Sequence, residues 1–518
     1  MESGKSGKNF VYWVSMGVTL AIVAFGLLFP AFFGAAAKGI FSFLTNWYNW
    51  GYMLCMNSYV IFPIFLAFTR FGKLKLGAPE SKPEFGNIPW FAMLFGCGMG
   101  VGLVFYGIGE PLSHYVSLPF GAAPGSEQAA RDAMRVSFYH WGLHPWAGYS
   151  VVALSLAYFQ FRKGAPGLMS SMFLPWLGEK GADSRLGRTI DILAVFATAA
   201  GIATSLGLGV MQIVSGLGYL FKLPNLSMDL GGRHLDSALV YQMLAIVVLA
   251  VIYTWTAVSG IEKGIKFISN LNLLLACLLL SAAFSFGPTA AILKRFGLGI
   301  FDYFTNLIQE SFTIPMKASP YKSWMSGWTI YYWSWWIAWA PFVGSFIARI
   351  SQGRTIREFV GGVLLVPALG SFVWFAVFGT CGLQLEINGI AEIGKAVAAD
   401  ISIGVFEMYK YYPLGGLLSI VMICLISTFF ITSANSGTFV LSMYSTQGDL
   451  NPPKGRMTVW GVLQALLAAA LLYTGGLQNL QLISIVAAAP FSIIMVLAWW
   501  CLWKTLTNDA GSLTELEK

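Results

Sequence analysis

Four tryptophans lie within seven residues, between Trp333 and Trp339. On an α-helix that turns about 100° per residue, Trp335, Trp336 and Trp339 share an arc of about 100°, and Trp333 lies about 60° further round. Aromatic faces attract cations that carry no N–H donors, above all quaternary ammonium groups. A membrane-interface belt or plain core packing would use the same residues, and helix geometry alone favours packing.

A second aromatic face lies earlier in the chain. Trp141, Trp146 and Tyr149 fall on one side of a helix. His140 and His144 have the i,i+4 spacing of metal ligands, but no cysteine or acidic third ligand recurs nearby. We therefore expect these histidines to be hydrogen-bonding residues near a helix start.

Glycine occupies every second position in one apolar stretch, at Gly96, Gly98, Gly100 and Gly102. Each costs a helix about 1 kcal/mol relative to alanine, and a spacing of two places glycine on every side, which packing alone does not explain. The pattern predicts an unwound segment, whose carbonyls could bind a cation and whose half-helix could attract a carboxylate. Glu110 follows on the same span, as a structural residue or as part of an entry path.

Hydroxyl groups gather at a third place. Thr432, Ser433 and Ser436 share a helix face with Phe429. Hydroxyl oxygens are hard ligands suited to a small alkali cation, but hydrogen bonding between membrane helices would use them equally well.

The elements that must position these residues are membrane spans. The chain has 518 residues, only 10% of them charged, and a mean hydropathy of +0.68. Soluble domains carry about 25% charged residues, so this is an integral membrane protein with helical spans. We expect about twelve, and no cleavable signal peptide: 10–36, 50–69, 88–115, 134–161, 188–221, 236–259, 266–287, 324–349, 356–381, 412–444, 456–475 and 479–503.

Charge patterning supplies the topology. If both termini are cytoplasmic, most of the 31 basic residues fall in cytoplasmic loops. This distribution follows the positive-inside rule. The net charge of +8 therefore reflects membrane topology rather than nucleic-acid binding. The mixed segment around 288–312 predicts an amphipathic helix on the membrane or along the bundle. Both tails are expected to be too short to fold as domains. The six cysteines lack metal-ligand spacing and are predicted to be buried small hydrophobes.

Together these motifs resemble the betaine/choline/carnitine transporter family. Residues 98–111 are similar to its glycine-rich third span, 140–149 to its fourth, 332–344 to its eighth, and 348–358 to the cytoplasmic loop that follows. The four motifs occur in the family's order, and the resemblance covers the whole chain except the tails.

The resemblance implies a fold that spacing cannot show. The chain would be an all-α membrane protein of the LeuT type, with two inverted five-helix repeats and probable assembly as a homotrimer. Residues 1–87 would hold the N-terminal tail and two peripheral spans, 88–287 repeat 1, 288–322 an amphipathic connecting helix, 323–504 repeat 2, and 505–518 a short cytoplasmic tail. The substrate site would lie at mid-membrane between the repeats.

The same resemblance assigns residues to a substrate site. Trp141, Trp146, Tyr149 and Trp336 would form a cage for a trimethylammonium or dimethylsulfonium head. The unwound backbone of Gly98, Met99, Gly100 and Gly102 would meet the substrate carboxylate. Trp335 and Trp339 would line the route to the cytoplasm, whereas Trp333 keeps a packing role.

The resemblance also implies a sodium site. Backbone oxygens near Gly96 and Met99 would bind sodium together with Phe429, Thr432 and Ser433. No Lys or Arg lies close to these motifs apart from helix-end residues, which favours sodium coupling over exchange.

Three positions depart from the family pattern. Choline-type members tend to carry Asp where Gly102 stands, so Gly102 indicates a zwitterion. A second sodium site would use Thr198 and Phe342, but Ile202 takes the place of its other hydroxyl residue. Asn435 stands where many members have Asp, a difference without an explanation.

The leading hypothesis is a sodium-coupled symporter of a zwitterionic onium solute such as glycine betaine, in the cytoplasmic membrane and with no cofactor besides the coupling ion. The alternative is a sodium-independent exchanger or uniporter of carnitine- or choline-like compounds. An osmosensor or receptor is less favoured because the tails are short. A membrane enzyme is least favoured, because the sequence shows no nucleophile–base pair, metal cluster or cofactor motif. Neither proline betaine nor dimethylsulfoniopropionate is separated from glycine betaine by sequence.

Overall fold

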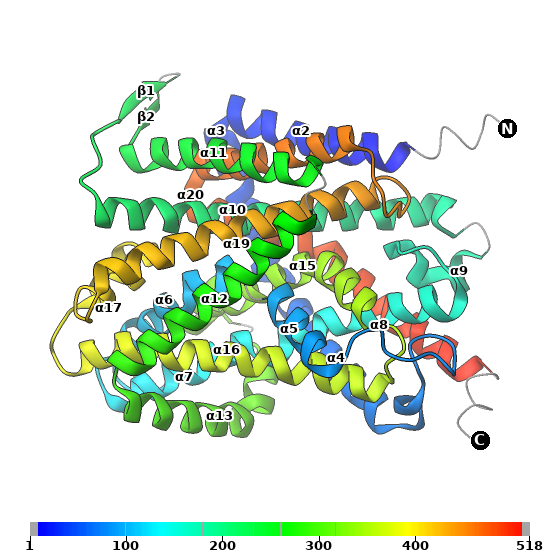
Figure 1. Ribbon diagram of the computed structural model, residues 1–518, viewed down its shortest axis with the longest axis horizontal. Coiled ribbons are helices and arrows are strands. Elements are labelled where there is room, and N and C mark those ends of the chain that lie inside the picture. The colour runs from blue at the N-terminus through cyan, green and yellow to red at the C-terminus, as the bar shows by residue number, and fades with distance from the viewer. Residues whose placement is uncertain are drawn as a thin grey trace.

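The protein is a bundle of helices, described by a computed structural model over residues 9–98, 100–178, 181–230, 233–259, 262–315 and 317–509 (Figure 1). The first group of helices is α2 (Phe10–Leu28), α3 (Pro30–Trp47), α4 (Asn49–Phe68), α5 (Asn87–Gly98), α6 (Val101–Ser117), α7 (Glu127–Trp141), α8 (Leu143–Lys163), α9 (Leu174–Leu177) and α10 (Arg185–Leu220). The second is α11 (Ser237–Ser259), α12 (Glu262–Phe286), α13 (Thr289–Phe312), α14 (Pro320–Gly327), α15 (Thr329–Ile350), α16 (Ile356–Ile387), α17 (Ile393–Ala399), α18 (Gly404–Tyr409), α19 (Gly415–Tyr444) and α20 (Lys454–Asn508). Four short 3₁₀ helices complete the set: η1 (Arg70–Lys73), η2 (Met169–Phe173), η3 (Gly181–Asp183) and η4 (Ile401–Ile403).

Eight helices within the described ranges are long and apolar enough to cross a membrane, or nine if the bent pair α5–α6 counts as one span. The chain is therefore an all-α, multi-pass membrane protein. Helices α8 and α15 have similar lengths, but their His, Tyr and Trp residues make them less apolar. The count of twelve spans stays a prediction.

The structure divides the first expected span and confirms the boundary expected between the last two. The stretch predicted as one span over 10–36 is two helices, α2 and α3, which meet at Phe29 before Pro30. Proline lacks the N–H that a continuous helix needs, so the break follows from chemistry. Conversely, the last two predicted spans lie within α20, separated by Gly476 at φ 57°. Glycine is the residue that adopts this left-handed conformation without strain.

A small hairpin was not predicted. Strands β1 (Met228–Leu230) and β2 (Arg233–Leu235) pair antiparallel, with Met228 opposite Leu235. Its sequence signal is the Gly231-Gly232 dipeptide between two short segments, a pattern typical of tight hairpins.

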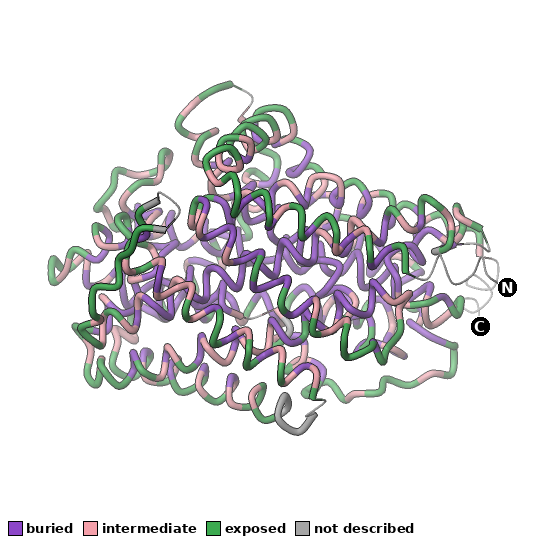
Figure 2. The backbone as a smooth tube through the Cα atoms, turned by 90° about the horizontal axis from the view of Figure 1, so that it is seen from above, coloured by how far each residue is buried: buried purple, intermediate pink, exposed green. Residues whose placement is uncertain are grey.

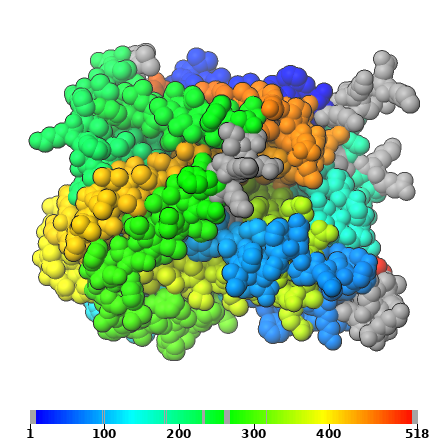
Figure 3. Space-filling model, viewed as in Figure 1, coloured from blue at the N-terminus to red at the C-terminus, as the bar shows by residue number. Residues whose placement is uncertain are grey.

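The core lies around α10, α8 and α15. In its most apolar window α10 is 83% buried, against 22% for α11 and for α12. Figure 2 shows buried backbone through the middle of the molecule and exposed backbone at its rim. Helices α11, α12, α13 and α19 form the outer face seen in Figure 3.

The predicted burial of the cysteines is partly wrong. Cys381 and Cys501 are buried, but Cys277 and Cys424 are exposed on α12 and α19. A helix that faces lipid can place a small apolar thiol outward without the cost of exposing it to water.

The amphipathic segment expected around 288–312 is α13, which packs along α7 and α16. Its polar residues Arg295 and Asp302 face the protein, whereas Phe301, Phe304 and Ile308 are exposed. The helix therefore lies along the bundle with its apolar side outward.

Candidate functional site

The glycine-rich stretch is a broken helix, as predicted. α5 ends at Gly98, α6 begins at Val101, and the two axes differ by 68°. A Cβ at Gly98 would collide with the Trp146 ring, and one at Gly102 would collide with the Trp335 ring. Glycine is thus required here because two indoles lie directly against the backbone. Met99 lies outside the described residues.

A second break positions the aromatic residues. Gly142, at φ −87° and ψ −130°, separates α7 from α8. Trp141 ends α7, whereas Trp146 and Tyr149 lie in the first two turns of α8. The three rings that sequence placed on one helix face therefore come from two helices that meet at an elbow.

The structure brings two of the predicted cage residues into direct contact. The rings of Trp141 and Trp336 meet edge to face, with centroids 4.8 Å apart and planes at 75°. Trp146 and Tyr149 form a second edge-to-face pair at 5.5 Å. All four side chains are buried. Aromatic pairs favour this edge-to-face arrangement, and indole faces are the groups that attract a cation without N–H donors.

Each ring of the first pair has a fixed hydrogen-bond partner. Trp141 Nε1 donates to Glu110 Oε2 at 2.9 Å, and Trp336 Nε1 donates to the His140 carbonyl at 3.1 Å. Because both indole N–H groups are held, the orientation of both rings is set by α6 and α7.

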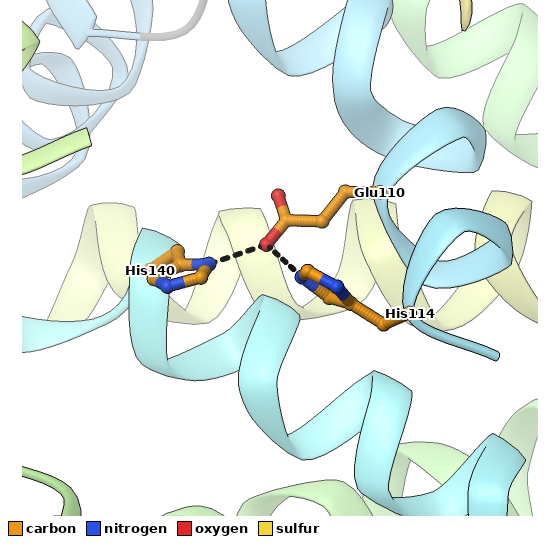
Figure 4. A group of neighbouring side chains, drawn as sticks. All are labelled: Glu110, His114 and His140. Atoms are coloured by element: carbon orange, nitrogen blue, oxygen red, sulfur yellow. Dashed lines mark hydrogen bonds and ion pairs between the residues drawn. The ribbon is translucent and has the colours of Figure 1, made fainter. Parts of the chain in front are cut away.

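Glu110 is the centre of a network that sequence left without a defined role (Figure 4). His140 Nδ1 lies 2.6 Å and His114 Nε2 3.3 Å from Glu110 Oε1, and Tyr332 donates to Oε2 at 2.6 Å. The side chains of Glu110, His114 and His140 are all of types that can ligate a metal ion. Since both histidine nitrogens approach one carboxylate oxygen, the arrangement is that of a hydrogen-bonded carboxylate.

The hydrogen-bonding role predicted for the histidines is confirmed. His140 Nε2 lies 2.9 Å from Thr329 Oγ1 at the start of α15. His144 Nε2 lies 3.3 Å from both Asn57 Oδ1 and Ser311 Oγ. The two histidines therefore link α7 and α8 to α4, α13 and α15.

Trp335 and Trp339 share one acceptor. Their indoles donate to the Gly201 carbonyl of α10, at 3.4 and 2.9 Å. Trp335 also stacks on Trp336, with centroids 4.9 Å apart. Trp335 thus lies beside the Trp141–Trp336 pair. Trp339 contacts Phe342 instead, with ring centroids 5.4 Å apart. Trp333 packs elsewhere, with its indole N–H on Met53 Sδ.

Phe342 lines a cavity of about 480 Å³. Ser345 and Arg349 line it from α15, and Asn435 and Ser436 line it from α19. Its size falls within the range of small-molecule sites.

The predicted hydroxyl patch lies against the broken helix. Ser433 Oγ is 3.7 Å from the position that a Gly100 Cβ would occupy. Thr432 Oγ1 donates to the carbonyls of Thr428 and Phe429 in its own helix and accepts from Asn272 Nδ2 on α12. Gly96 has open space around its Cα.

Sequence reasoning missed Asn272 on α12. Its Nδ2 donates to Thr432 Oγ1 at 3.2 Å, and its buried Oδ1 has no hydrogen-bond partner among the described residues. Asn272 follows Asn270 in a mostly apolar run, and this spacing carries no site signal, so only the packing of α12 on α19 reveals it.

Thr198 and Phe342 are the residues expected at a second sodium site, and the structure gives them different surroundings. Thr198 Oγ1 is buried without a hydrogen-bond partner in the described part of the chain. Ile202, one turn on, packs its side chain against Gly437. Phe342 packs on Trp339 and lines the cavity instead.

The fold and this site define a multi-pass membrane protein with buried aromatic residues gathered beside two broken helices. A family model described as BCCT, betaine/carnitine/choline family transporter, matches residues 10–511. The chain belongs to this family, and it is therefore a transporter rather than an enzyme.

Named relatives match along almost the whole chain. The glycine betaine transporter OpuD of Bacillus subtilis (strain 168) is 45% identical, over 98% of this chain and 96% of its own length. A probable glycine betaine transporter of Desulfitobacterium hafniense (strain Y51) is 41% identical, over 97% and 98%. An ectoine/hydroxyectoine transporter of Virgibacillus pantothenticus is also 41% identical, over 94% of both chains.

Proposed function

We propose that this transporter is a sodium-coupled symporter of a zwitterionic quaternary ammonium or sulfonium solute such as glycine betaine. The observation that carries the proposal is the buried edge-to-face pair of Trp141 and Trp336, with both indole N–H groups held by other partners. A ring whose N–H is already bonded offers a substrate only its π face. That face favours a methylated cation, which has no N–H of its own to satisfy.

The carboxylate end of the substrate would be met at the break between α5 and α6. The first amides of α6 have no acceptors within the helix, and a helix N-terminus favours negative charge. Gly98 and Gly102 contact Trp146 and Trp335, so this backbone lies directly beside the aromatic residues. An onium group and a carboxylate on one small molecule could therefore be bound at once.

Sodium would bind to the hydroxyl patch on α19 and to backbone oxygens of α5. Ser433 lies against Gly100, and Thr432 accepts from Asn272, whose Oδ1 has no hydrogen-bond partner among the described residues. Oxygen ligands from side chains and unwound backbone suit a small alkali cation. Because Ile202 packs on Gly437, we propose one sodium site rather than two.

Alternating access would carry the substrate past Trp339 to the cavity that begins at Phe342. This cavity lies at the Arg349 end of α15, the end that the positive-inside rule assigns to the cytoplasm. The proposal includes twelve spans arranged as two inverted repeats, both termini in the cytoplasm, residence in the cytoplasmic membrane, and assembly as a homotrimer.

Two measurements test the proposal on purified protein. Tryptophan fluorescence should report saturable binding of glycine betaine that strengthens with sodium. Proteoliposomes should accumulate the solute only under an inward sodium gradient. Sodium-independent uptake that is stimulated by internal substrate would instead identify an exchanger of carnitine- or choline-like compounds.

Ectoine is the second candidate substrate, because one relative of 41% identity is an ectoine/hydroxyectoine transporter. Competition between ectoine and glycine betaine in the same fluorescence titration separates the two. Displacement of ectoine by glycine betaine only at large excess would overturn the onium preference.

A further inference from the structure

The elbow between α7 and α8 exposes backbone groups that a continuous helix would satisfy. Leu143 begins α8 directly after Gly142, so its N–H has no acceptor within that helix. A buried amide without an acceptor destabilises a protein, because folding removes the water that hydrogen-bonds it in the unfolded chain. Some other element must therefore supply an acceptor at this point.

That acceptor comes from α13. Leu143 N donates to Tyr303 Oη at 2.9 Å, and Tyr303 is fully buried. A Cβ on Gly142 would lie 2.7 Å from the same hydroxyl oxygen. The Tyr303 hydroxyl thus lies against the elbow itself, one residue from Trp141.

α13 also holds the helices on both sides of the elbow. On the α8 side, Ser311 Oγ lies 3.3 Å from His144 Nε2. On the α7 side, ion pairs join the two helices along their length: Glu127 with Arg295 at 2.8 Å and with Lys294 at 3.8 Å, Arg131 with Asp302, and Arg135 with Glu310 at 3.0 Å. One helix therefore contacts α7 over its length and α8 at its first turn.

The elbow angle decides where the predicted cage residues lie. Trp141 precedes Gly142, and Trp146 and Tyr149 follow it. The His140 carbonyl that holds Trp336 is also part of the last turn of α7. α15, which carries Trp336, packs along α8. A change of angle at Gly142 would therefore move Trp141 relative to Trp146 and Tyr149, and would move the His140 carbonyl away from Trp336.

We infer that α13 braces this elbow and that Tyr303 is a positioning residue for onium binding, through its hydrogen bond to Leu143. The inference rests on the proposed function, because it assigns Tyr303 to the geometry of the same aromatic site. Tyr303 acts at a distance from the substrate, by fixing the backbone between two parts of the cage.

The test is the variant Tyr303→Phe, which removes the hydroxyl and keeps the ring. Its matched control is Tyr253→Phe. Tyr253 is equally buried, on α11, and its hydroxyl donates to the Gly461 carbonyl at 2.6 Å. Both variants lose one buried hydrogen bond, so both should lose a similar amount of thermal stability.

Glycine betaine affinity should separate the two variants. We expect Y303F to bind on the order of fivefold more weakly, the effect of one net hydrogen bond, while Y253F binds as the wild type does. In proteoliposomes Y303F should raise KM with little change in maximal rate. Ser311→Ala removes the contact to His144 and should also weaken glycine betaine binding. It is the alternative test if Y303F does not fold.

Equal affinities in Y303F, Y253F and the wild type would overturn the inference and leave the proposed function standing. Equal losses in Y303F and Y253F would show a general effect of stability and would also overturn it. Absence of onium binding by the wild type would overturn the proposed function, and the inference with it.

Discussion

Glu110 Oε2 accepts a hydrogen bond from Trp141 Nε1 at 2.9 Å. The bond joins α6, the helix that follows the glycine break, to the last residue of α7. The two irregular points of the backbone, at Gly100 and at Gly142, are thus connected through one carboxylate. A movement at the predicted carboxylate-binding backbone would be transmitted to the aromatic cage.

Glu110→Gln should weaken onium binding and lower thermal stability. The carboxylate accepts from up to four groups, and an amide would turn its NH₂ toward at least one donor among Trp141, Tyr332 and His140. Loss of a hydrogen bond to a charged group costs about 1.5–3 kcal/mol. Thermal unfolding and fluorescence titration measure the two effects. Glu392→Gln, at a side chain that is 79% exposed, is the control and should change neither.

Trp336→Leu should abolish most onium uptake. A desolvated cation–π contact is worth about 2 kcal/mol, or roughly 30-fold in affinity. Trp336→Phe keeps an aromatic face but loses the hydrogen bond to the His140 carbonyl. Its uptake should therefore lie between that of the wild type and that of Trp336→Leu. Trp255→Leu removes an exposed indole from α11 and should transport normally. Full uptake by W336L in proteoliposomes would show that the substrate binds elsewhere.

Gly98→Ala and Gly102→Ala should both inactivate transport. A methyl group at either position collides with an indole, at Trp146 or at Trp335, and both rings are buried. Gly361→Ala on α16 is the matched control, because nothing lies within 4 Å of its added Cβ. It should retain uptake and gain up to about 1 kcal/mol of helix stability. Similar uptake by all three variants would contradict this account of the glycine pattern.

Ser433→Ala should weaken the dependence on sodium more than the binding of substrate at saturating sodium. Removal of one oxygen ligand should raise the sodium concentration for half-maximal uptake on the order of tenfold. Thr428→Ala lies one turn earlier on α19, where its hydroxyl bonds only to the carbonyls of Cys424 and Leu425, and is the control. An unchanged sodium response in S433A would remove this residue from the proposed site.

Much of the architecture could be predicted because local chemistry dictates it. Alternate glycines predicted the break between α5 and α6, and mixed polarity predicted the amphipathic helix α13. Both are properties of a short segment, readable without knowledge of its neighbours. The break at Phe29 was missed although Pro30 marks it, because a long apolar run was taken as one helix.

The sites were predictable only as residue types. Sequence identified Trp141 and Trp336 as aromatic candidates, and the structure shows their rings in contact. It gave no defined role to Glu110 and named Tyr332 only as part of the 332–344 motif, because a carboxylate acquires its role from the donors that surround it. Asn272 was missed for the same reason.

The sequence by itself determined that this chain is a helical membrane protein, which family motifs it carries, and that its backbone breaks in the glycine-rich stretch. These follow from hydropathy and glycine, which act on the chain locally. Only the tertiary structure decided that Glu110 holds Trp141, that the His140 carbonyl holds Trp336, and that Tyr303 reaches the elbow at Gly142. Each of these contacts joins residues at least 30 positions apart, and a hydrogen bond over that separation exists only once the helices have packed.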